Sequence, residues 1–249
     1  MPRANRYFLP GHVWHITHRC HRRDFLLKFQ RDRLCWRQWL FESCKRYDLC
    51  VLNYIVTSNH IHLLVRDTGR NEIPPAMRLI AGRTAQAYNR RKNRKGAFWE
   101  DRYHATAVET GDHLARCLVY IDLNMVRAGA VQHPSEWLVS GYHEIQLPPR
   151  RYRIIDREAL ARAVDLPTLQ SLADTHRGWV DDALHNDRAA RDDRWTQALA
   201  AGSEPFVRTI HVQLGIRAVD RSVRNDADAS HLAEDPAPYG HIPDPKWPF

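Results

Sequence analysis

The chain has 249 residues, 43% of them hydrophobic, and a formal net charge of +8 at pH 7. This length and composition suit one large domain, or a domain of about 150 residues with an appendage, and they exclude a wholly disordered chain. No apolar run is long enough to span a membrane and the N-terminus lacks a signal-peptide core, so we expect a cytoplasmic protein without a membrane partner. The five cysteines show no paired spacing, which favours free thiols over a disulfide scaffold.

Charge is distributed unevenly along the chain. Residues 1–150 carry 24 Lys and Arg against 13 Asp and Glu, a net charge of +11, whereas residues 151–249 have a net charge of −3. A positive domain of this kind predicts a polyanionic partner, most often nucleic acid.

The hydrophobic pattern predicts alternating strands and helices as far as residue 129. Alternation and β-branched residues, bounded by Gly, Pro or Asn, predict strands around 13–17, 50–57, 60–66 and 97–108. Apolar residues at helical spacing predict helices over 31–47, from 74 to about 91, and over 111–129. The order β-α-β-β-α-β-α indicates an α+β domain with an antiparallel sheet, similar to the ferredoxin-like split β-α-β fold.

The character of the sequence changes after Pro148 and Pro149. Residues 156–200 and 203–224 have helical spacing, and the last twenty residues are rich in proline. We therefore divide the chain into a domain at 1–148 and a mostly helical C-terminal region at 149–249 with an irregular tail.

Two imidazoles, those of His60 and His62, lie two residues apart on the strand expected at 60–66. Successive strand side chains alternate between the faces of a sheet, so both rings lie on one face. There they can hold one metal ion between them. They can equally be ordinary buried histidines that bond to backbone or carboxylate groups, and the pair alone does not decide between these interpretations.

The helix expected over 111–129 carries further polar side chains. Tyr120 and Asn124 lie one turn apart on one face, with Arg127 close by. An amide oxygen can join two imidazoles in binding a divalent cation, and a phenol beside a cation and a phosphate is a candidate nucleophile. A second apolar ridge on this helix predicts that it packs between two surfaces.

Four ordered pieces of the sequence resemble a known family. They are residues 10–15, 58–64, 96–103 and 120–129, and a tryptophan-serine element follows at Trp137 and Ser140. The pieces resemble the HUH endonucleases and, more narrowly, the REP-associated tyrosine transposases, which are relatives of single-tyrosine insertion-sequence transposases. The resemblance covers about residues 7–145.

The resemblance implies a role for each candidate site residue. Tyr120 stands at the family's nucleophile position, His60 and His62 at its metal-ligand positions, and Asn124 where the family places a third polar ligand. Met125 replaces the proline that usually follows this asparagine, a departure that bears on the direction of the Asn124 side chain. The implied activity is metal-dependent cleavage and rejoining of single-stranded DNA through a 5′-phosphotyrosine. The implied cofactor is Mg²⁺ or Mn²⁺, and the implied partner is single-stranded or hairpin (REP-type) DNA.

Contacts with DNA phosphates are expected from basic residues around these motifs, above all from the run at 90–95. The candidates are Arg3, Arg6, Arg90, Arg91, Lys92, Arg94, Lys95, Arg102 and Arg127. Candidates for stacking on bases are Tyr7, Phe8, Trp99 and Tyr103.

Two other functions compete with a nickase and strand transferase. A non-catalytic protein that binds single-stranded nucleic acid would retain the fold without turnover, although here every catalytic position implied by the resemblance is filled. A structural zinc protein would need two further soft ligands, which the scattered cysteines do not supply at a suitable spacing. The sequence leaves both monomer and homodimer open.

Overall fold

The computed structural model describes residues 8–186, 192–226 and 228–234. The first part of the chain forms β1 (Val13–Arg19), α1 (Gln30–Tyr47), β2 (Cys50–Val56), β3 (His60–Arg66), α2 (Ile73–Arg91), β4 (His104–Val108), α3 (Asp112–Asp122) and α4 (Asn124–Arg127). Its strands pair in the order β2-β3-β1-β4, and each of these pairings is antiparallel. The predicted element order and the split β-α-β arrangement are confirmed.

The C-terminal region is mostly helical, as expected, but it also extends the sheet. After α5 (Tyr142–Gln146), which ends the first part, this region contains α6 (Arg157–Ala163), α7 (Leu169–His185), α8 (Arg194–Gln197), β5 (Ala200–Gly202), α9 (Glu204–Leu214), β6 (Arg221–Asn225) and β7 (Ser230–Glu234). β5 pairs in parallel with β4, and the β6-β7 hairpin completes one seven-stranded sheet. The helix expected over 203–224 instead ends before Gly215. The proline-rich tail lies outside the described residues.

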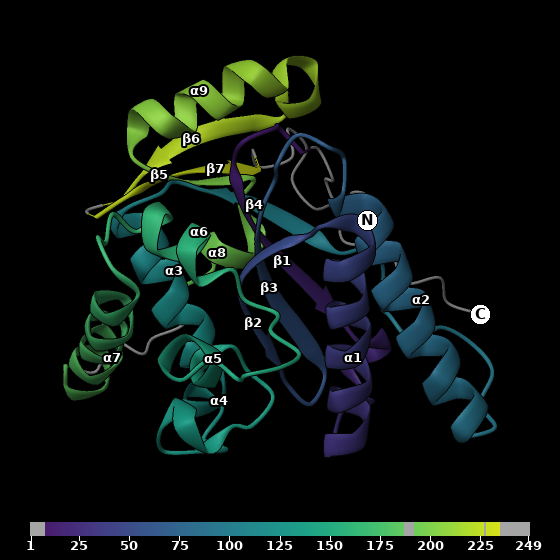
Figure 1. Ribbon diagram of the computed structural model, residues 1–249. Helices are drawn as coiled ribbons and strands as arrows, with labels where there is room; N and C mark the ends of the chain where they lie inside the picture. The colour runs from purple at the N-terminus through teal and green to yellow at the C-terminus, as the bar shows by residue number, and fades with distance from the viewer. Residues whose placement is uncertain (1–7, 187–191, 227, 235–249) are drawn as a thin grey trace, which may run out of the picture.

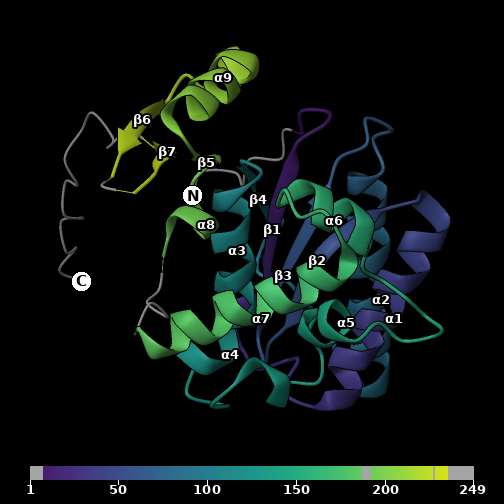
Figure 2. The same cartoon turned by 60° about the vertical axis from the view of Figure 1, so that its left-hand side comes forward.

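Helices cover both faces of the sheet (Figures 1 and 2). α1 and α2 pack on one face, whereas α3, α5 and α7 lie on the other. Side chains alternate between the two faces of the sheet along β3. Ile61, Leu63 and Val65 point to one face, and His60 and His62 point to the other. No helix in the described ranges is long and apolar enough to cross a membrane.

The strand expected over 97–108 is shorter in the structure. Residues 97–103 form an irregular segment that meets the end of β1 through a bridge between Cys20 and Trp99. The Trp99 indole donates a hydrogen bond to the Ala81 carbonyl at 3.0 Å, and Phe98 is buried beside α2. The aromatic residues that suggested a longer strand therefore fill the core.

The helix expected over 111–129 is interrupted at Leu123, where α3 gives way to α4. Gly129 follows α4 with a φ of 65°, a left-handed conformation that suits glycine after a helix end. The second apolar ridge of α3 packs on α7, where Leu123 and Val180 are fully buried. The prediction that this helix lies between two packed surfaces is confirmed.

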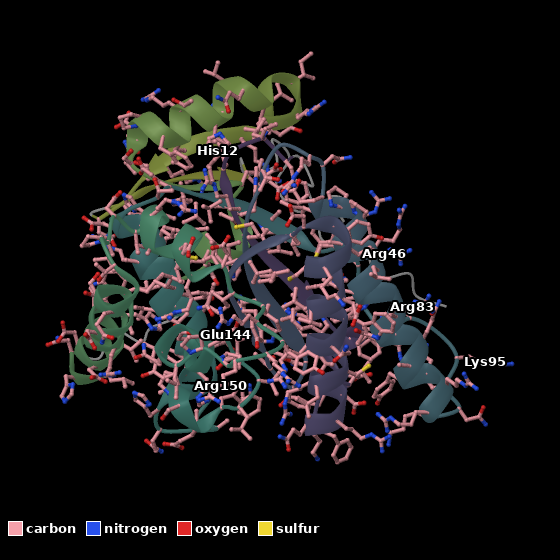
Figure 3. All side chains as sticks on the ribbon, in the orientation of Figure 1. His12, Arg46, Arg83, Lys95, Glu144 and Arg150 are labelled. Atoms are coloured by element: carbon pink, nitrogen blue, oxygen red, sulfur yellow. The ribbon has the colours of Figure 1, made fainter. Side chains whose placement is uncertain are left out.

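The first part of the chain and the C-terminal region are joined by several contacts. Glu144 of α5 accepts the backbone N–H groups of Ile154 and Ile155 at 2.6 and 2.9 Å (Figure 3). Trp137 donates a hydrogen bond to the Val56 carbonyl at 2.9 Å, so the tryptophan-serine element packs against β2. The sheet runs across the division expected between residues 148 and 149, and that boundary stays a prediction.

Candidate functional site

A row of polar side chains crosses the sheet beneath α3. The pairing of β1 with β3 and β4 puts His15, His62 and Thr106 on the same face. Their exposed fractions are 0%, 2% and 0%. Polar groups buried this deeply need hydrogen-bond partners, and these residues supply several of them to one another and to the C-terminal region.

His15 lies at the centre of the row. Its Nε2 is 2.8 Å from Nδ1 of His62, and its Nδ1 is 2.7 Å from the carbonyl oxygen of Trp195. Burial lowers the pKa of His15 to about 3. Burial also lowers the pKa of His62 well below its ordinary value, and the neighbouring His60, His15 and Arg127 act in the same direction. Both buried rings are therefore neutral at physiological pH.

His60 stands at the beginning of β3 and is half-buried. Its Nδ1 lies 2.7 Å from Oδ1 of Asn59 and 3.0 Å from the hydroxyl of Thr57. An amide oxygen can only accept a hydrogen bond, so His60 Nδ1 carries the proton and Nε2 keeps its lone pair. The centres of the His60 and His62 rings are 4.9 Å apart, as strand alternation predicts for neighbours on one face.

Asn124 extends from the start of α4 toward the same rings. Its Nδ2 lies 2.9 Å from Nε2 of His62. Adjacent ligands of an octahedral cation with bonds of about 2.1 Å are about 3 Å apart, so this spacing suits two ligands of one ion once the amide turns its oxygen inward. The replacement of proline by Met125 does not turn Asn124 away from the histidines.

Tyr120, near the end of α3, packs edge-on against the buried histidines. Its ring centre is 5.9 Å from that of His62 and 6.2 Å from that of His15. The Arg127 guanidinium lies 4.2 Å above the phenol ring and donates a 2.6 Å hydrogen bond to the Tyr120 carbonyl. The structure thus brings Tyr120, the histidines and Asn124 together, and it holds Arg127 against the phenol.

The donors present fit a divalent cation. Two imidazoles with unprotonated Nε2 atoms and one amide make a set compatible with Mg²⁺ or Mn²⁺. Within the described residues, no group of three or more His, Cys, Asp or Glu side chains is arranged to hold a metal ion, as a closed zinc site would require. Burial also raises the pKa of Cys20 and of Cys44 to about 12, which disfavours the thiolate form.

The basic residues expected to contact DNA fall into different settings. Arg91 forms an ion pair with Asp32, and Arg94 donates hydrogen bonds to Asn89 and to the Ala97 carbonyl, so both are engaged within the protein. Side chains exposed to solvent are those of Arg90, Lys92, Lys95 and Arg102. Lys95 projects beyond the end of α2 (Figure 3). Arg3 and Arg6 lie outside the described residues.

The aromatic residues expected to stack on bases are poorly placed for that role. Tyr103 is only 6% exposed. Trp99 is stacked on His18, with ring centres 4.1 Å apart. Phe8 packs on Trp14 at 5.0 Å, and Tyr7 lies outside the described residues.

A loop beside His60 is not among the site elements predicted from the sequence. Residues 20–29, which we call the β1-α1 loop, follow β1 and precede α1. The Arg23 carbonyl accepts a 3.1 Å hydrogen bond from the Asn59 amide, the same residue that holds His60. The loop therefore borders the open side of the candidate site.

The β1-α1 loop carries exposed aromatic and basic side chains. Phe25 and Phe29 are 65% and 52% exposed. The amino group of Lys92 lies 5.5 Å from the centre of the Phe29 ring. Exposed cations on the loop itself are Arg22, Arg23 and Lys28. The sequence does contain a signal for this surface. Two phenylalanines occur within a run of basic residues that has neither helical nor strand spacing.

A cavity of about 1280 Å³ lies between α3, α7, α8 and the β6-β7 hairpin, and Tyr120 and Arg127 are among the residues that line it. Its walls carry more carboxylates than cations, and Arg194 there is bonded to Asp192 and Asp228. An acidic wall repels phosphates. The basic loop next to His60 is the side with the favourable charge for a nucleic acid.

Comparisons with known proteins agree with this geometry. Residues 10–124 match the family described as IS200-like transposases. The chain is similar in structure to a REP-associated tyrosine transposase bound to a REP hairpin, with a TM-score of 0.51 and 21% identity over 58% of this chain and 84% of that one. A Deinococcus radiodurans protein described as a candidate transposase matches with a TM-score of 0.35 and 14% identity, over 52% of this chain and 98% of that one. None of the curated proteins matches the chain.

The chain shares its split β-α-β sheet with the REP-associated tyrosine transposase, and on this sheet the paired histidines face a tyrosine on a helix. The match to the IS200-like transposase family covers residues 10–124, the part of the chain that carries the paired histidines and Tyr120. This shared fold agrees with the resemblance found in the sequence.

Proposed function

We propose that this protein cuts and rejoins single-stranded DNA through a covalent bond to Tyr120. The observation that carries the proposal is the convergence of four side chains from the sheet and the α3-α4 segment. Nε2 of His62 lies 2.9 Å from the Asn124 amide, and the Tyr120 and His60 rings have their centres 5.9 and 4.9 Å from that of His62.

His60, His62 and Asn124 are the residues that would hold Mg²⁺ or Mn²⁺. When bound, such a cation would neutralise charge on the scissile phosphate. The two imidazoles suit this role because each has its Nδ1 hydrogen-bonded to another residue and its Nε2 turned toward the proposed site.

Tyr120 is the proposed nucleophile. Its phenol oxygen attacks phosphorus, and the bond from phosphorus to the 3′ oxygen of the preceding nucleotide breaks. The phenol proton passes to solvent, and the departing 3′ oxygen takes up a proton. Because an ordinary phenol has a pKa of about 10, it needs cationic help to attack, and the Arg127 guanidinium over the ring can stabilise the phenolate.

The products are a 5′-phosphotyrosine and a 3′-hydroxyl. The covalent link conserves the phosphodiester bond energy, so a 3′-hydroxyl from the same or another strand can reverse the attack and join DNA. A hairpin substrate is supported by the positive charge of residues 1–150 and by the REP hairpin bound to the similar transposase.

The first prediction concerns the covalent adduct. Full-length protein is incubated with a labelled hairpin that has single-stranded flanks, in Mn²⁺ or Mg²⁺, and the products are separated under denaturing conditions. Wild type should form a protein–DNA adduct, and Tyr120→Phe should abolish it because only the nucleophilic oxygen is removed. Tyr152→Phe is the matched control, since Tyr152 is 69% exposed and makes no part of the site.

An adduct formed equally well by Tyr120→Phe would exclude Tyr120 as the nucleophile. Binding of the hairpin by wild type without any adduct, with either cation, would favour the non-catalytic nucleic-acid-binding protein instead. Loss of the adduct in His60→Ala and in His62→Ala would support the metal site.

A further inference from the structure

A chain of hydrogen bonds links the C-terminal region to the candidate metal site. At one end stands the carbonyl oxygen of Trp195 in α8, which can only accept a hydrogen bond. His15 Nδ1 lies 2.7 Å from this oxygen, so Nδ1 carries the proton. The Trp195 carbonyl therefore fixes which nitrogen of His15 is the donor.

The second ring nitrogen of His15, Nε2, faces His62. Its ring is fully buried, and among the described residues its hydrogen-bond partners are a carbonyl and a second imidazole rather than a carboxylate. The Asn124 amide nitrogen donates to the His62 Nε2 at 2.9 Å, so the His62 proton lies on Nδ1 and points at the His15 Nε2, which is its acceptor. A neutral ring protonated at Nδ1 has an unprotonated Nε2, which must accept a hydrogen bond across the 2.8 Å to His62 Nδ1.

His62 therefore carries its proton on Nδ1 and its lone pair on Nε2. The other end of the chain agrees, because the Asn124 Nδ2 lies 2.9 Å from that Nε2 and an amide nitrogen donates to a lone pair. His60 is held in the same tautomer by a neighbour in sequence, the Oδ1 atom of Asn59 at 2.7 Å. His62 depends instead on a residue of another strand.

We propose that His15 is a positioning residue that holds His62 in the Nδ1-protonated tautomer and so presents the His62 Nε2 lone pair to the divalent cation. Histidine ligands of metals commonly donate their second N–H to an acceptor that fixes the ring. Here the acceptor is a third histidine, anchored in turn by the backbone of Trp195. The inference rests on the proposed metal site. It connects that site to Trp195, which lies beyond the range 10–124 that matches the family.

The tautomer is tested first in the wild-type protein. Long-range ¹H–¹⁵N correlation spectra of metal-free protein labelled at histidine distinguish a protonated ring nitrogen from an unprotonated one, and His62→Ala assigns the His62 signals. We expect a protonated Nδ1 and an unprotonated Nε2 on His62. A proton on Nε2 in the wild type would overturn the proposal without any His15 variant.

His15→Phe then removes the acceptor while keeping a ring in the core. The His62 proton should move to Nε2, where the Asn124 oxygen can accept it after the amide turns. The affinity for Mn²⁺, measured by electron paramagnetic resonance of the free ion, should fall by about 10- to 100-fold. His15→Gln has both an acceptor for His62 and a donor for the Trp195 carbonyl, so it should restore most of the affinity and the wild-type tautomer.

His18→Phe is the matched control. His18 lies on the same strand but on the opposite face, stacked on Trp99, so this change should leave the His62 tautomer and the Mn²⁺ affinity unaltered. A His15→Phe protein that loses thermal stability while keeping both readouts would overturn the proposal in favour of simple packing. Wild type with the expected tautomer but no Mn²⁺ binding would overturn the proposed metal site, so the two failures are distinguishable.

Discussion

The hydrogen-bond partners of His62 differ from those of an ordinary buried histidine and suit the binding of a metal ion. The usual partners of such a residue are backbone carbonyls and carboxylates, whereas the His62 ring nitrogens lie next to the His15 imidazole and the Asn124 amide. Both partners leave its Nε2 unprotonated, the state in which a histidine binds metals. The interpretation of the pair as ordinary buried histidines is therefore disfavoured by the contacts.

The buried histidines predict how stability varies with pH. Burial is the largest cause of the lowered pKa values of His15, His62 and His104. In the unfolded chain a histidine has a pKa of about 6.5, so below that pH the unfolded state binds more protons and the folded state loses stability as the pH falls. For His15, whose folded pKa is about 3, this loss extends from the unfolded pKa down to about pH 3.

We expect the free energy of unfolding of the metal-free protein, measured with urea, to fall steadily from pH 7 to pH 5. His15→Phe should make this fall shallower, because unfolding then takes up about one proton fewer once the single buried group has been removed. An identical pH dependence in wild type and variant would contradict the prediction.

The residues of the candidate site differ in how far the sequence could identify them. His60 and His62 share a face through strand alternation, and Tyr120 and Asn124 through helical spacing, so local periodicity was enough. The part played by His15 depends on the register of β1 with β3, and Trp195 is separated from it by 180 positions. Such contacts are made by the tertiary fold and have no local signature.

At the scale of elements, the β1-α1 loop brings a surface suited to single-stranded DNA next to His60. Stacking of a base on an exposed aromatic ring contributes about 1–3 kcal/mol, so Phe25→Ala should weaken binding of single-stranded DNA by about 5- to 100-fold. Binding of duplex DNA should change little, because paired bases offer no exposed face. Fluorescence anisotropy with both DNAs measures the difference.

The control for the loop is Tyr152→Ala, which removes an aromatic ring that is 69% exposed elsewhere on the chain. An equal loss for single-stranded and duplex DNA in Phe25→Ala would indicate that the loop acts through charge or folding. No loss for either DNA would remove the loop from the binding surface.

Elements with strong periodicity were predicted, and short or polar ones were not. α1 and β3 follow the expected ranges closely because their apolar residues recur at one clear spacing. β5 has only three residues, Ala200–Gly202, and β6 begins and ends with polar side chains, so neither shows strand alternation. These strands form because β4 and β7 offer them backbone partners.

For the molecule as a whole, the C-terminal region takes part in building the site. β5 continues the sheet that carries the histidines, and α8 supplies the carbonyl that bonds to His15. The same region forms the acidic walls of the cavity beyond Tyr120. Acidic residues of this region thus line the cavity that Tyr120 also lines, whereas the basic β1-α1 loop contacts Asn59 beside His60.

This charge arrangement predicts where DNA binds. Lys92→Glu together with Lys95→Glu should weaken hairpin binding strongly and lower the salt dependence of affinity, by about 0.7 in the log–log slope for each lost contact with a single strand. Arg46→Glu is the matched control, because Arg46 is also exposed on the α1-α2 side but lies toward the other end of these helices (Figure 3). If DNA were bound nonspecifically by the whole positive surface, each charge reversal would reduce affinity equally. A loss of affinity per reversed charge that is larger at the end of α2 than at Arg46, in titrations at several salt concentrations, would locate the DNA beside His60 and the β1-α1 loop.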